Sequence, residues 1–501
     1  MKKRISLLLF ASILISTLLT GCADDIQPAN DTSATATTTA PQATEAPQEN
    51  AAPTTEEILG FSAEDNGRRT FTILTNSTSA YEFNVKSETG DIVDDAVFKK
   101  ESMVEEYLGI EIELIHESGL WKTRAAFNAK ITNAYATGDD TYDLVNNMLV
   151  CTLPLAQQGV FVNVNELQYT NFDQPWYITD MTENYGIKGK LYGILSDHSL
   201  SLYKDLSVIF FNATIFENQK SDVNLYDLVR KNEWTLDKFI ELTSDMASDL
   251  NGDGQYDIDN DLLAYFGEAV PNGTWMTSMD IDIIDLNSDG TYTYHGLSDR
   301  LTDLYTKLAN YRKSVPGIID HDSNGKTPGH FPPRETFAEG KVAMMSNHIY
   351  TTEYIRDMEN DYGIIPIPKY DQTQENYISQ VGTSTSTLFI PQNQDDLDLI
   401  AKFIECEAYF GYTKVSPIYY EAALKARYAN DPNISDMLDI VRQNATIDFL
   451  FVYSTSLSSS PYMLLRDFSN PKTNLASWFT TNKRMFISSV DKLLAAYESL
   501  E

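Results

Sequence analysis

The stretch Ile110-Glu111-Ile112-Glu113-Leu114-Ile115 alternates apolar and acidic residues and predicts a β-strand. Segments with helical spacing lie on both sides of it, at residues 98–108 and 125–135, and Gly109 follows the first as a helix C-cap would. Farther out, the apolar runs at residues 70–75 and 142–145 predict two more strands. Strand–helix–strand–helix–strand in this order predicts a parallel α/β sheet.

Polar residues follow or end two of these strands. Asn76 and Ser77 come directly after the strand at residues 70–75, and Asn146 and Asn147 come after the strand at residues 142–145. Open α/β sheets bind ligands beyond the carboxyl ends of their strands. We therefore expect Asn76, Asn146 and Asn147 to belong to a ligand site.

A second α/β unit is predicted after Gly189-Lys190-Leu191-Tyr192-Gly193. The chain of 501 residues is too long for a single hydrophobic core, which itself predicts at least two domains. No internal linker separates the two units. Their predicted elements are strands at 206–211, 342–345, 363–366 and 383–390, and helices at 223–230, 235–248, 401–410 and 485–500.

The N-terminus has the pattern of an export signal. Lys2, Lys3 and Arg4 precede an apolar run, residues 5–18, that is too short to span a bilayer comfortably. Leu19-Thr20-Gly21-Cys22 resembles the lipobox of bacterial lipoproteins, in which the signal is cut before a cysteine that carries diacylglycerol. We expect residues 1–21 to be a signal peptide, and a lipid on Cys22 to anchor the chain on the extracytoplasmic face of the cell membrane.

The composition excludes some partners and predicts a linker. Residues 23–57 contain no aromatic residue, Lys or Arg, so we expect disorder there and assign residues 22–65 to a linker. The net charge of −35 argues against nucleic acid as a partner, because binding phosphates requires basic patches. Besides Cys22 only Cys151 and Cys406 remain, and their apolar surroundings favour free, buried thiols over a disulfide.

Several motifs in a fixed order carry a family resemblance. From residue 66 to residue 501 the chain resembles the extracellular solute-binding lipoproteins of ABC importers, the large group that includes maltose-binding protein. The most specific motif is Phe-x-x-Gly-Lys-x-Ala-Met at residues 337–344. The others are Gly138–Val145, Pro175-Trp176-Tyr177, Gly189–Gly193, Trp234–Phe239, Ile364–Lys369 and Pro417–Glu421.

This resemblance implies a two-lobed α/β fold of the periplasmic-binding-protein type (type II), with three crossing segments and a ligand cleft between the lobes. The implied division is residues 66–200 and 369–416 for the first lobe and 201–368 and 417–501 for the second. It further implies a monomer that closes around a solute and delivers it to the permease subunits of an ABC transporter, without catalysis.

The resemblance also points to a carbohydrate ligand. In maltose-binding relatives the loop after the Phe-x-x-Gly-Lys-x-Ala-Met strand supplies an aromatic ring that stacks on sugar. Here Tyr350 would take that role, with Asn347 or His348 on the hydroxyl groups. Trp275, in a polar loop, is a second candidate platform, although a Trp of this kind also packs in cores. Trp176 and Trp234 are interpreted as structural, and Trp121 stays undecided.

Other functions remain open at this stage. Peptides and polyamines are alternative solutes, and a surface sensor or adhesin would use the same body without transport. A glycoside hydrolase is the least favoured reading, although any two of the 72 acids could meet in space as a catalytic pair. The sequence contains no Gly-x-Ser-x-Gly, His-Glu-x-x-His or phosphate-binding glycine motif.

A loop at residues 249–261 has the spacing of a calcium-binding loop. Asp249, Asn251, Asp253 and Asp257 occupy ligand positions 1, 3, 5 and 9, Gly254 is at position 6, and Gln255 would lend a carbonyl at position 7. Position 12 is Asn260 rather than Glu, and Asp261 lies one residue later. We expect a structural Ca²⁺ ion here. The similar run at residues 285–290 is better explained as a hairpin with an Asp-Gly turn.

Overall fold

The computed structural model describes residues 53–83, 86–268, 273–287, 289–321, 332–420, 432–464 and 474–500. These residues all belong to one compact unit, residues 53–501. The predicted signal peptide, Cys22 and the linker up to residue 52 lie outside the described residues, as do Pro271 and Asn272 beside Trp275.

The first sheet has four strands in the order β12-β3-β1-β2. Strands β2 and β3 run parallel to β1, as the sequence predicted, and β12 runs antiparallel to β3. Strand β12 comes from a part of the chain more than two hundred residues away from β3. The bounds are β1 (Arg69–Asn76), β2 (Ile110–Glu117), β3 (Leu144–Met148) and β12 (Ser386–Phe389).

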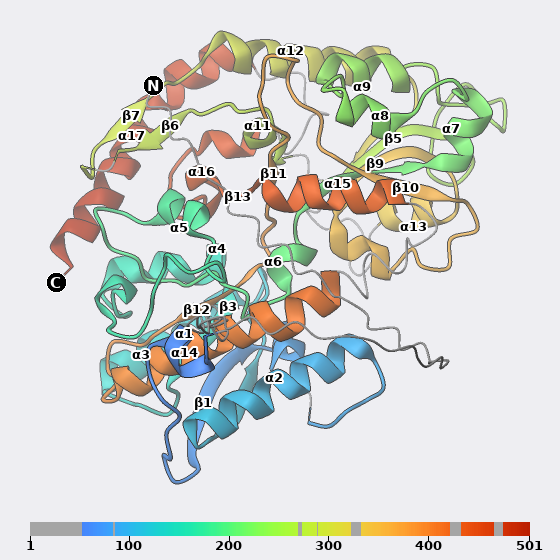
Figure 1. Ribbon diagram of the computed structural model, residues 1–501. Coiled ribbons are helices and arrows are strands. Elements are labelled where there is room, and N and C mark those ends of the chain that lie inside the picture. The colour runs from blue at the N-terminus through green and yellow to red at the C-terminus, as the bar shows by residue number, and fades with distance from the viewer. Residues whose placement is uncertain are drawn as a thin grey trace, which may run out of the picture. The chain divides into compact units, whose positions relative to one another are not determined.

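Helices α2 (Ile92–Leu108) and α14 (Leu397–Phe410) lie side by side against this sheet, and α3 (Arg124–Thr137) connects β2 to β3 (Figure 1). Helix α2 begins six residues earlier than predicted, because the Asp91 side chain accepts hydrogen bonds from the backbone N–H groups of Val93 and Asp94 and so caps the helix there. It ends at Gly109, whose φ of 60° is the left-handed conformation expected of a C-cap.

The second sheet has five strands in the order β10-β4-β9-β5-β8. Strand β9, at the centre of this sheet, begins with Val342-Ala343-Met344, the end of the Phe-x-x-Gly-Lys-x-Ala-Met motif, and all seven residues of the strand are buried. The bounds are β4 (Ser207–Asn212), β5 (Leu263–Glu268), β8 (Ile318–His321), β9 (Val342–His348) and β10 (Tyr362–Pro366).

Helix α9 (Leu236–Thr243) begins as predicted, since Thr235 caps it through the Lys238 N–H. It ends five residues before the predicted end. The other helices that follow or precede strands of the second sheet are α7 (Ala213–Gln219), α8 (Leu225–Arg230), α12 (Asp299–Ser314), α13 (Pro332–Ala338) and α15 (Pro432–Gln443).

The remaining elements are short, apart from the C-terminal helix α17 (Leu475–Ser499), which starts ten residues before the predicted helix. The predicted hairpin is confirmed: β6 (Ile284–Leu286) pairs antiparallel with β7 (Tyr292–Tyr294), and Gly290 in its turn has a φ of 80°. Strands β11 (Ser379–Gln380) and β13 (Ala445–Thr446) pair in parallel. The short helices are α4 (Leu149–Thr152), α5 (Thr179–Tyr185), α6 (Ser201–Lys204), α11 (Trp275–Ser278) and α16 (Phe449–Val452).

The ordered chain begins earlier than the predicted linker boundary at residue 65. Helix α1 (Thr55–Leu59) has a complete capping box between Thr54 and Glu57, and Gly60 ends it in the left-handed conformation. Leu59 and Phe61 are buried in the core. The prediction of disorder is therefore wrong for residues 55–65, because two apolar side chains there find a place in the core that the segment's composition does not reveal.

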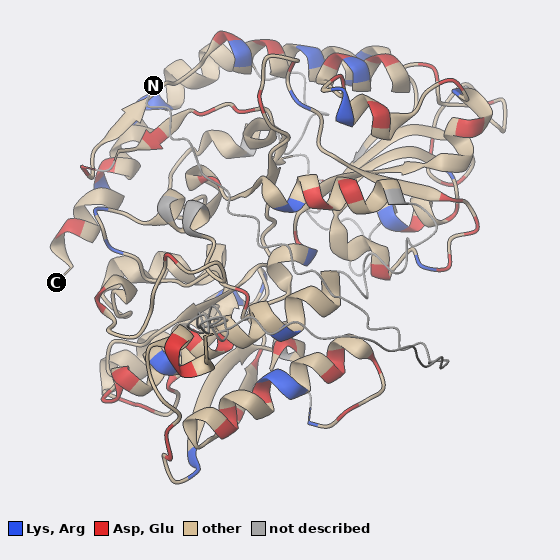
Figure 2. Ribbon diagram, in the orientation of Figure 1, with Lys and Arg blue, Asp and Glu red and all other residues tan. Residues whose placement is uncertain are grey.

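No helix in the described part of the chain combines the length and the apolar character needed to cross a membrane. Helices α2 and α12 both carry acidic and basic residues (Figure 2); acidic residues are more frequent on α2 and basic residues on α12. Cys151 and Cys406 are free and buried, as expected.

Candidate functional site

Three asparagines at the end of the first sheet are fully buried. Asn76 is the last residue of β1. The prediction that Asn146 and Asn147 follow the third strand is wrong, because β3 runs from Leu144 to Met148 and contains both, and Asn146 pairs there with Thr75. Among the described residues, the Asn76 Nδ2 and the Oδ1 atoms of Asn146 and Asn147 have no hydrogen-bond partner. Buried amide groups in native proteins are nearly always hydrogen-bonded. These atoms therefore mark a place where the protein can offer hydrogen bonds to another molecule.

Glu82 joins this edge of the first sheet to the segment that leads into the second. Glu82 is 2% exposed. Its carboxylate accepts hydrogen bonds from the Ser199 hydroxyl, from the Ser201 N–H at 3.2 Å and from Asn146 Nδ2 at 3.5 Å. The Ser201 hydroxyl in turn accepts a hydrogen bond from the Ser386 N–H at 2.8 Å, next to β3.

Asp205 and His348 form the corresponding polar group of the second sheet. His348 is the last residue of β9 and pairs with Ser207 of β4. The Asp205 carboxylate accepts a hydrogen bond from the Ser384 N–H at 2.7 Å, just before β12 of the first sheet. Both polar groups are therefore hydrogen-bonded to the same segment of the chain, Glu82 through Ser201 and the Ser386 N–H, and Asp205 through the Ser384 N–H.

The approach of His348 to Asp205 depends on a glycine. The Nδ1 of His348 lies 3.7 Å from Oδ1 of Asp205, beyond hydrogen-bond distance, and neither ring nitrogen has a partner among the described residues. A Cβ added at Gly382 would lie 2.5 Å from His348 Nε2 and 2.7 Å from Asp205 Oδ2. Only glycine fits at position 382. The absence of a side chain there leaves the space that the His348 ring and the Asp205 carboxylate share.

Burial determines the charge of both groups. Desolvation raises the pKa of Asp205 to about 7, against hydrogen bonds that favour the carboxylate. Desolvation, with the nearby Arg334 guanidinium, lowers the pKa of His348 to about 3. His348 is therefore a neutral imidazole at neutral pH, with one nitrogen able to donate and the other able to accept.

Tyr350 is placed beside this group. Its ring stacks on that of His348, with centroids 5.5 Å apart and planes at 24°, and the Arg334 guanidinium lies 5.7 Å from its centroid. Asn347 is used locally, because its Oδ1 accepts the His348 N–H at 2.8 Å. Five of the predicted ligand residues therefore fall into two groups. The first consists of Asn76, Asn146 and Asn147, and the second of His348 and Tyr350.

Trp275 is not among them. It is fully buried in the second unit, where its ring packs edge-on against Phe239 at 5.1 Å and lies 6.3 Å from Tyr265. The structure places it in the packing position that was the alternative to a ligand platform. Its role in binding stays a prediction.

A cavity of about 230 Å³ lies beside the polar residues and contains groups that the sequence analysis missed. Lys204 lies over the rings of Tyr81 and Tyr419, at 4.6 and 5.5 Å, and pairs with Glu353 at 2.9 Å. Tyr419 belongs to the recognised Pro417–Glu421 motif, and Tyr81 belongs to the polar stretch after β1. The sequence did not indicate Lys204 as a site residue, because its partners Tyr81, Glu353 and Tyr419 lie more than a hundred residues away along the chain.

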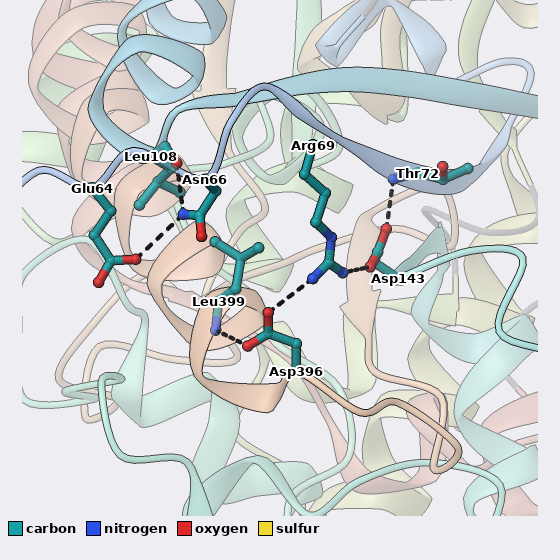
Figure 3. Close-up of polar contacts among 8 residues, drawn as sticks. All are labelled: Glu64, Asn66, Arg69, Thr72, Leu108, Asp143, Asp396 and Leu399. Atoms are coloured by element: carbon teal, nitrogen blue, oxygen red, sulfur yellow. Dashed lines mark hydrogen bonds and ion pairs between the residues drawn. The ribbon is translucent and has the colours of Figure 1, made fainter.

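Three of the motifs that carry the family resemblance contain residues that stabilise the fold. Asp143, from the Gly138–Val145 motif, binds Arg69 of β1, which also binds Asp396 at the start of α14 (Figure 3). Trp234 Nε1 donates to the Pro366 carbonyl at 2.8 Å. Trp176 Nε1 donates to Glu405 at 3.0 Å, so the structural reading of both tryptophans agrees with their burial.

The acidic loop at residues 249–261 turns its carboxylates toward its own backbone. Asp249 accepts hydrogen bonds from the N–H groups of Gly252 at 2.7 Å and Gly254 at 2.8 Å. The buried Asp261 accepts from Leu250 and Asp257. Within the described ranges, no group of three or more His, Cys, Asp or Glu side chains converges well enough to hold a metal ion. Calcium binding by Asp249, Asn251, Asp253, Gln255, Asp257 and Asp261 stays a prediction.

Comparison with known proteins supports the fold. No family model matches the chain, and no curated protein matches it. Among solved structures, an ABC substrate-binding protein from Listeria monocytogenes in complex with cycloalternan is similar, with a TM-score of 0.54 and 13% sequence identity over 83% of this chain and 99% of that one. The chain has the two-lobed α/β fold of substrate-binding proteins, as the sequence predicted.

Proposed function

We propose that this chain is the carbohydrate-binding component of an ABC importer, and that it captures its solute at the buried polar residues between β1, β3 and β9. The observation that supports this most directly is the set of buried side chains with unpartnered polar atoms, Asn76, Asn146, Asn147 and His348. Neutral amide and imidazole groups both donate and accept hydrogen bonds, as the hydroxyl groups of a sugar require.

The similar Listeria protein, which was solved with cycloalternan, supports this choice of solute class. The aromatic groups near the site agree with it as well, because sugar rings stack on flat aromatic faces. Tyr350 lies beside His348, and Tyr81 and Tyr419 line the neighbouring cavity. We propose an oligosaccharide rather than a single sugar, and binding rather than turnover.

The proposal also covers the membrane anchor and the partner of the protein. A diacylglycerol on Cys22 holds the chain on the extracytoplasmic face of the membrane, where two acyl chains are enough for stable anchoring. The chain acts as a monomer and delivers its solute to permease subunits. Replacing Cys22 with Ser and measuring how much protein is released into the medium tests the anchor, and full retention would contradict it.

A thermal-shift screen of the mature protein tests the solute class. A ligand that binds only the native state raises the Tm, and the rise grows with the logarithm of its concentration relative to its Kd. We expect a rise with cycloalternan, maltotriose or another oligosaccharide, without consumption of the sugar. A rise only with oligopeptides or with spermidine would replace the carbohydrate assignment, and release of free monosaccharide would show an enzyme.

A further inference from the structure

Trp121 is an exposed aromatic side chain in a loop that is well held. It is 45% exposed, whereas Trp176, Trp234 and Trp275 are at most 3% exposed. The loop runs from β2 to α3. The hydroxyl groups of Ser118 and Thr123 are 2.8 Å apart, and the Thr123 N–H donates to the Leu120 carbonyl at 2.8 Å, so the loop is closed across its base.

One face of the Trp121 ring is already occupied. The guanidinium carbon of Arg124 lies 4.1 Å from the ring centroid, and Arg124 also donates a hydrogen bond to the Trp121 carbonyl. A cation in this position holds the indole through a cation–π contact. The ring is therefore oriented in advance, and 45% of the side chain remains exposed to another molecule.

The loop is attached to the candidate site. The Gly119 N–H donates to Asn76 Oδ1 at 3.1 Å, and a Cβ on Gly119 would lie 2.4 Å from Asn147 Oδ1. Trp121 is thus two residues away from the point where the backbone touches two of the buried asparagines. Both asparagines keep one polar atom without a partner among the described residues.

We propose that Trp121 is the stacking platform of the ligand site in the first lobe, and that Arg124 positions its ring. This inference rests on the proposed function and names the side chain that recognises the apolar face of a sugar ring. Asn76 and Asn147 would bind hydroxyl groups of the same sugar, while the indole covers its C–H face. Trp275, which the sequence made a candidate for this task, is fully buried instead.

The test compares Trp121→Ala and Trp121→Phe with the unchanged protein by calorimetric titration of cycloalternan and maltotriose. We expect about tenfold weaker binding for the alanine variant, because it loses both the stacking contact and the apolar area of the ring, and most of the affinity to return with phenylalanine. Tyr135→Ala is the matched control, since Tyr135 is 40% exposed on α3 of the same lobe. It should bind as the unchanged protein does.

Fluorescence supplies a readout that a purely structural role would not affect. Trp121 is far more exposed than Trp176, Trp234 and Trp275. Sugar stacking on Trp121 should therefore shift the emission to shorter wavelength and protect it from acrylamide quenching. The Trp121→Phe protein should bind sugar without that change. Equal affinity of the alanine variant and the unchanged protein would overturn the role of Trp121 and leave the proposed function intact. Absence of sugar binding by the unchanged protein would overturn both.

Discussion

Arg69 and Asp143 form an ion pair 2.6 Å long that joins β1 to the residue before β3. Asp143 also accepts the Thr72 N–H at 2.7 Å, and Arg69 reaches Asp396 at 2.8 Å, so one arginine connects β1, the start of β3 and the N-terminus of α14 (Figure 3). The acid of the Gly138–Val145 motif is therefore a structural residue that sets the position of β3, and with it the position of Asn146.

Arg69, the first residue of β1, and Arg68, which precedes the strand, allow a matched comparison. Arg69→Ala leaves the 11%-exposed carboxylate of Asp143 without its cation, and we expect a loss of about 1–3 kcal/mol in the free energy of unfolding. Arg68 pairs with Glu111, and their side chains are 79% and 57% exposed, so Arg68→Ala should cost less than about 1 kcal/mol. Urea unfolding of both variants measures the difference, and equal losses would contradict this role of Arg69.

Glu405 should make stability depend on pH. Burial raises its pKa from 4.5 to about 7, against hydrogen bonds from Tyr177 and Trp176. The folded chain therefore holds this proton more tightly than the unfolded chain, and the free energy of unfolding falls as the pH rises from about 4.5 to about 7.

Glu405→Gln removes this titration and keeps an oxygen that accepts a hydrogen bond. We expect the variant to lose less stability than the unchanged protein between pH 5 and pH 7, roughly the window of that titration. Glu111→Gln, at an exposed position, is the control. Urea unfolding at the two pH values decides the question, and parallel curves for both variants and the unchanged protein would show that Glu405 is not responsible.

His348 should separate binding from stability. Its two ring nitrogens are buried without partners among the described residues, which costs stability in the absence of ligand. His348→Phe keeps the stacking on Tyr350 and removes both polar atoms. We expect a ligand-free protein that is as stable as the original or up to about 1 kcal/mol more stable, with sugar binding strongly weakened. Thermal unfolding with and without sugar measures both, and unchanged affinity would remove His348 from the site.

Calcium binding by the loop at residues 249–261 can be tested through the Tm. If Asp249 and its neighbours hold a structural ion, adding a chelator should lower the Tm by several degrees and adding Ca²⁺ should restore it, because the ion binds only the folded chain. Asp249→Asn should lose that response. The same Tm with and without chelator would show that the loop is held by its own hydrogen bonds, which connect Asp249 to Gly252 and Gly254.

Local sequence patterns predicted the elements better than their ends. Alternation and helical spacing predicted β1, β2 and α3 to within two residues. The starts of α2 and α17 were missed by six and ten residues, because Asp91 and Asn474 cap these helices before the apolar spacing begins. Helix α1 was missed altogether, since its stability depends on the burial of Leu59 in a core built by later residues.

Some residues of the candidate site could be predicted from the sequence and others could not. The place of Asn76 could be predicted because it ends β1, at the carboxyl edge of the parallel strands. The place of Asn146 was predicted less well, since it lies inside β3 and not after it. Glu82 and Asp205 could not, since their partners Ser199 and Ser384 lie more than a hundred residues away. Nothing in the sequence separates Trp275 in the core from Trp121 at the surface, because both occur in short loop-like stretches.

The sequence by itself determined the α/β class, the parallel direction of the first three strands and the asparagine at the end of β1. These follow from periodicity and chain order within one short part of the chain. Only the tertiary structure decided which polar groups share the site, which tryptophan is exposed and that β12 pairs with β3. Those outcomes depend on contacts between residues far apart in the chain, and burial, which sets both hydrogen bonding and charge, exists only once these contacts have formed.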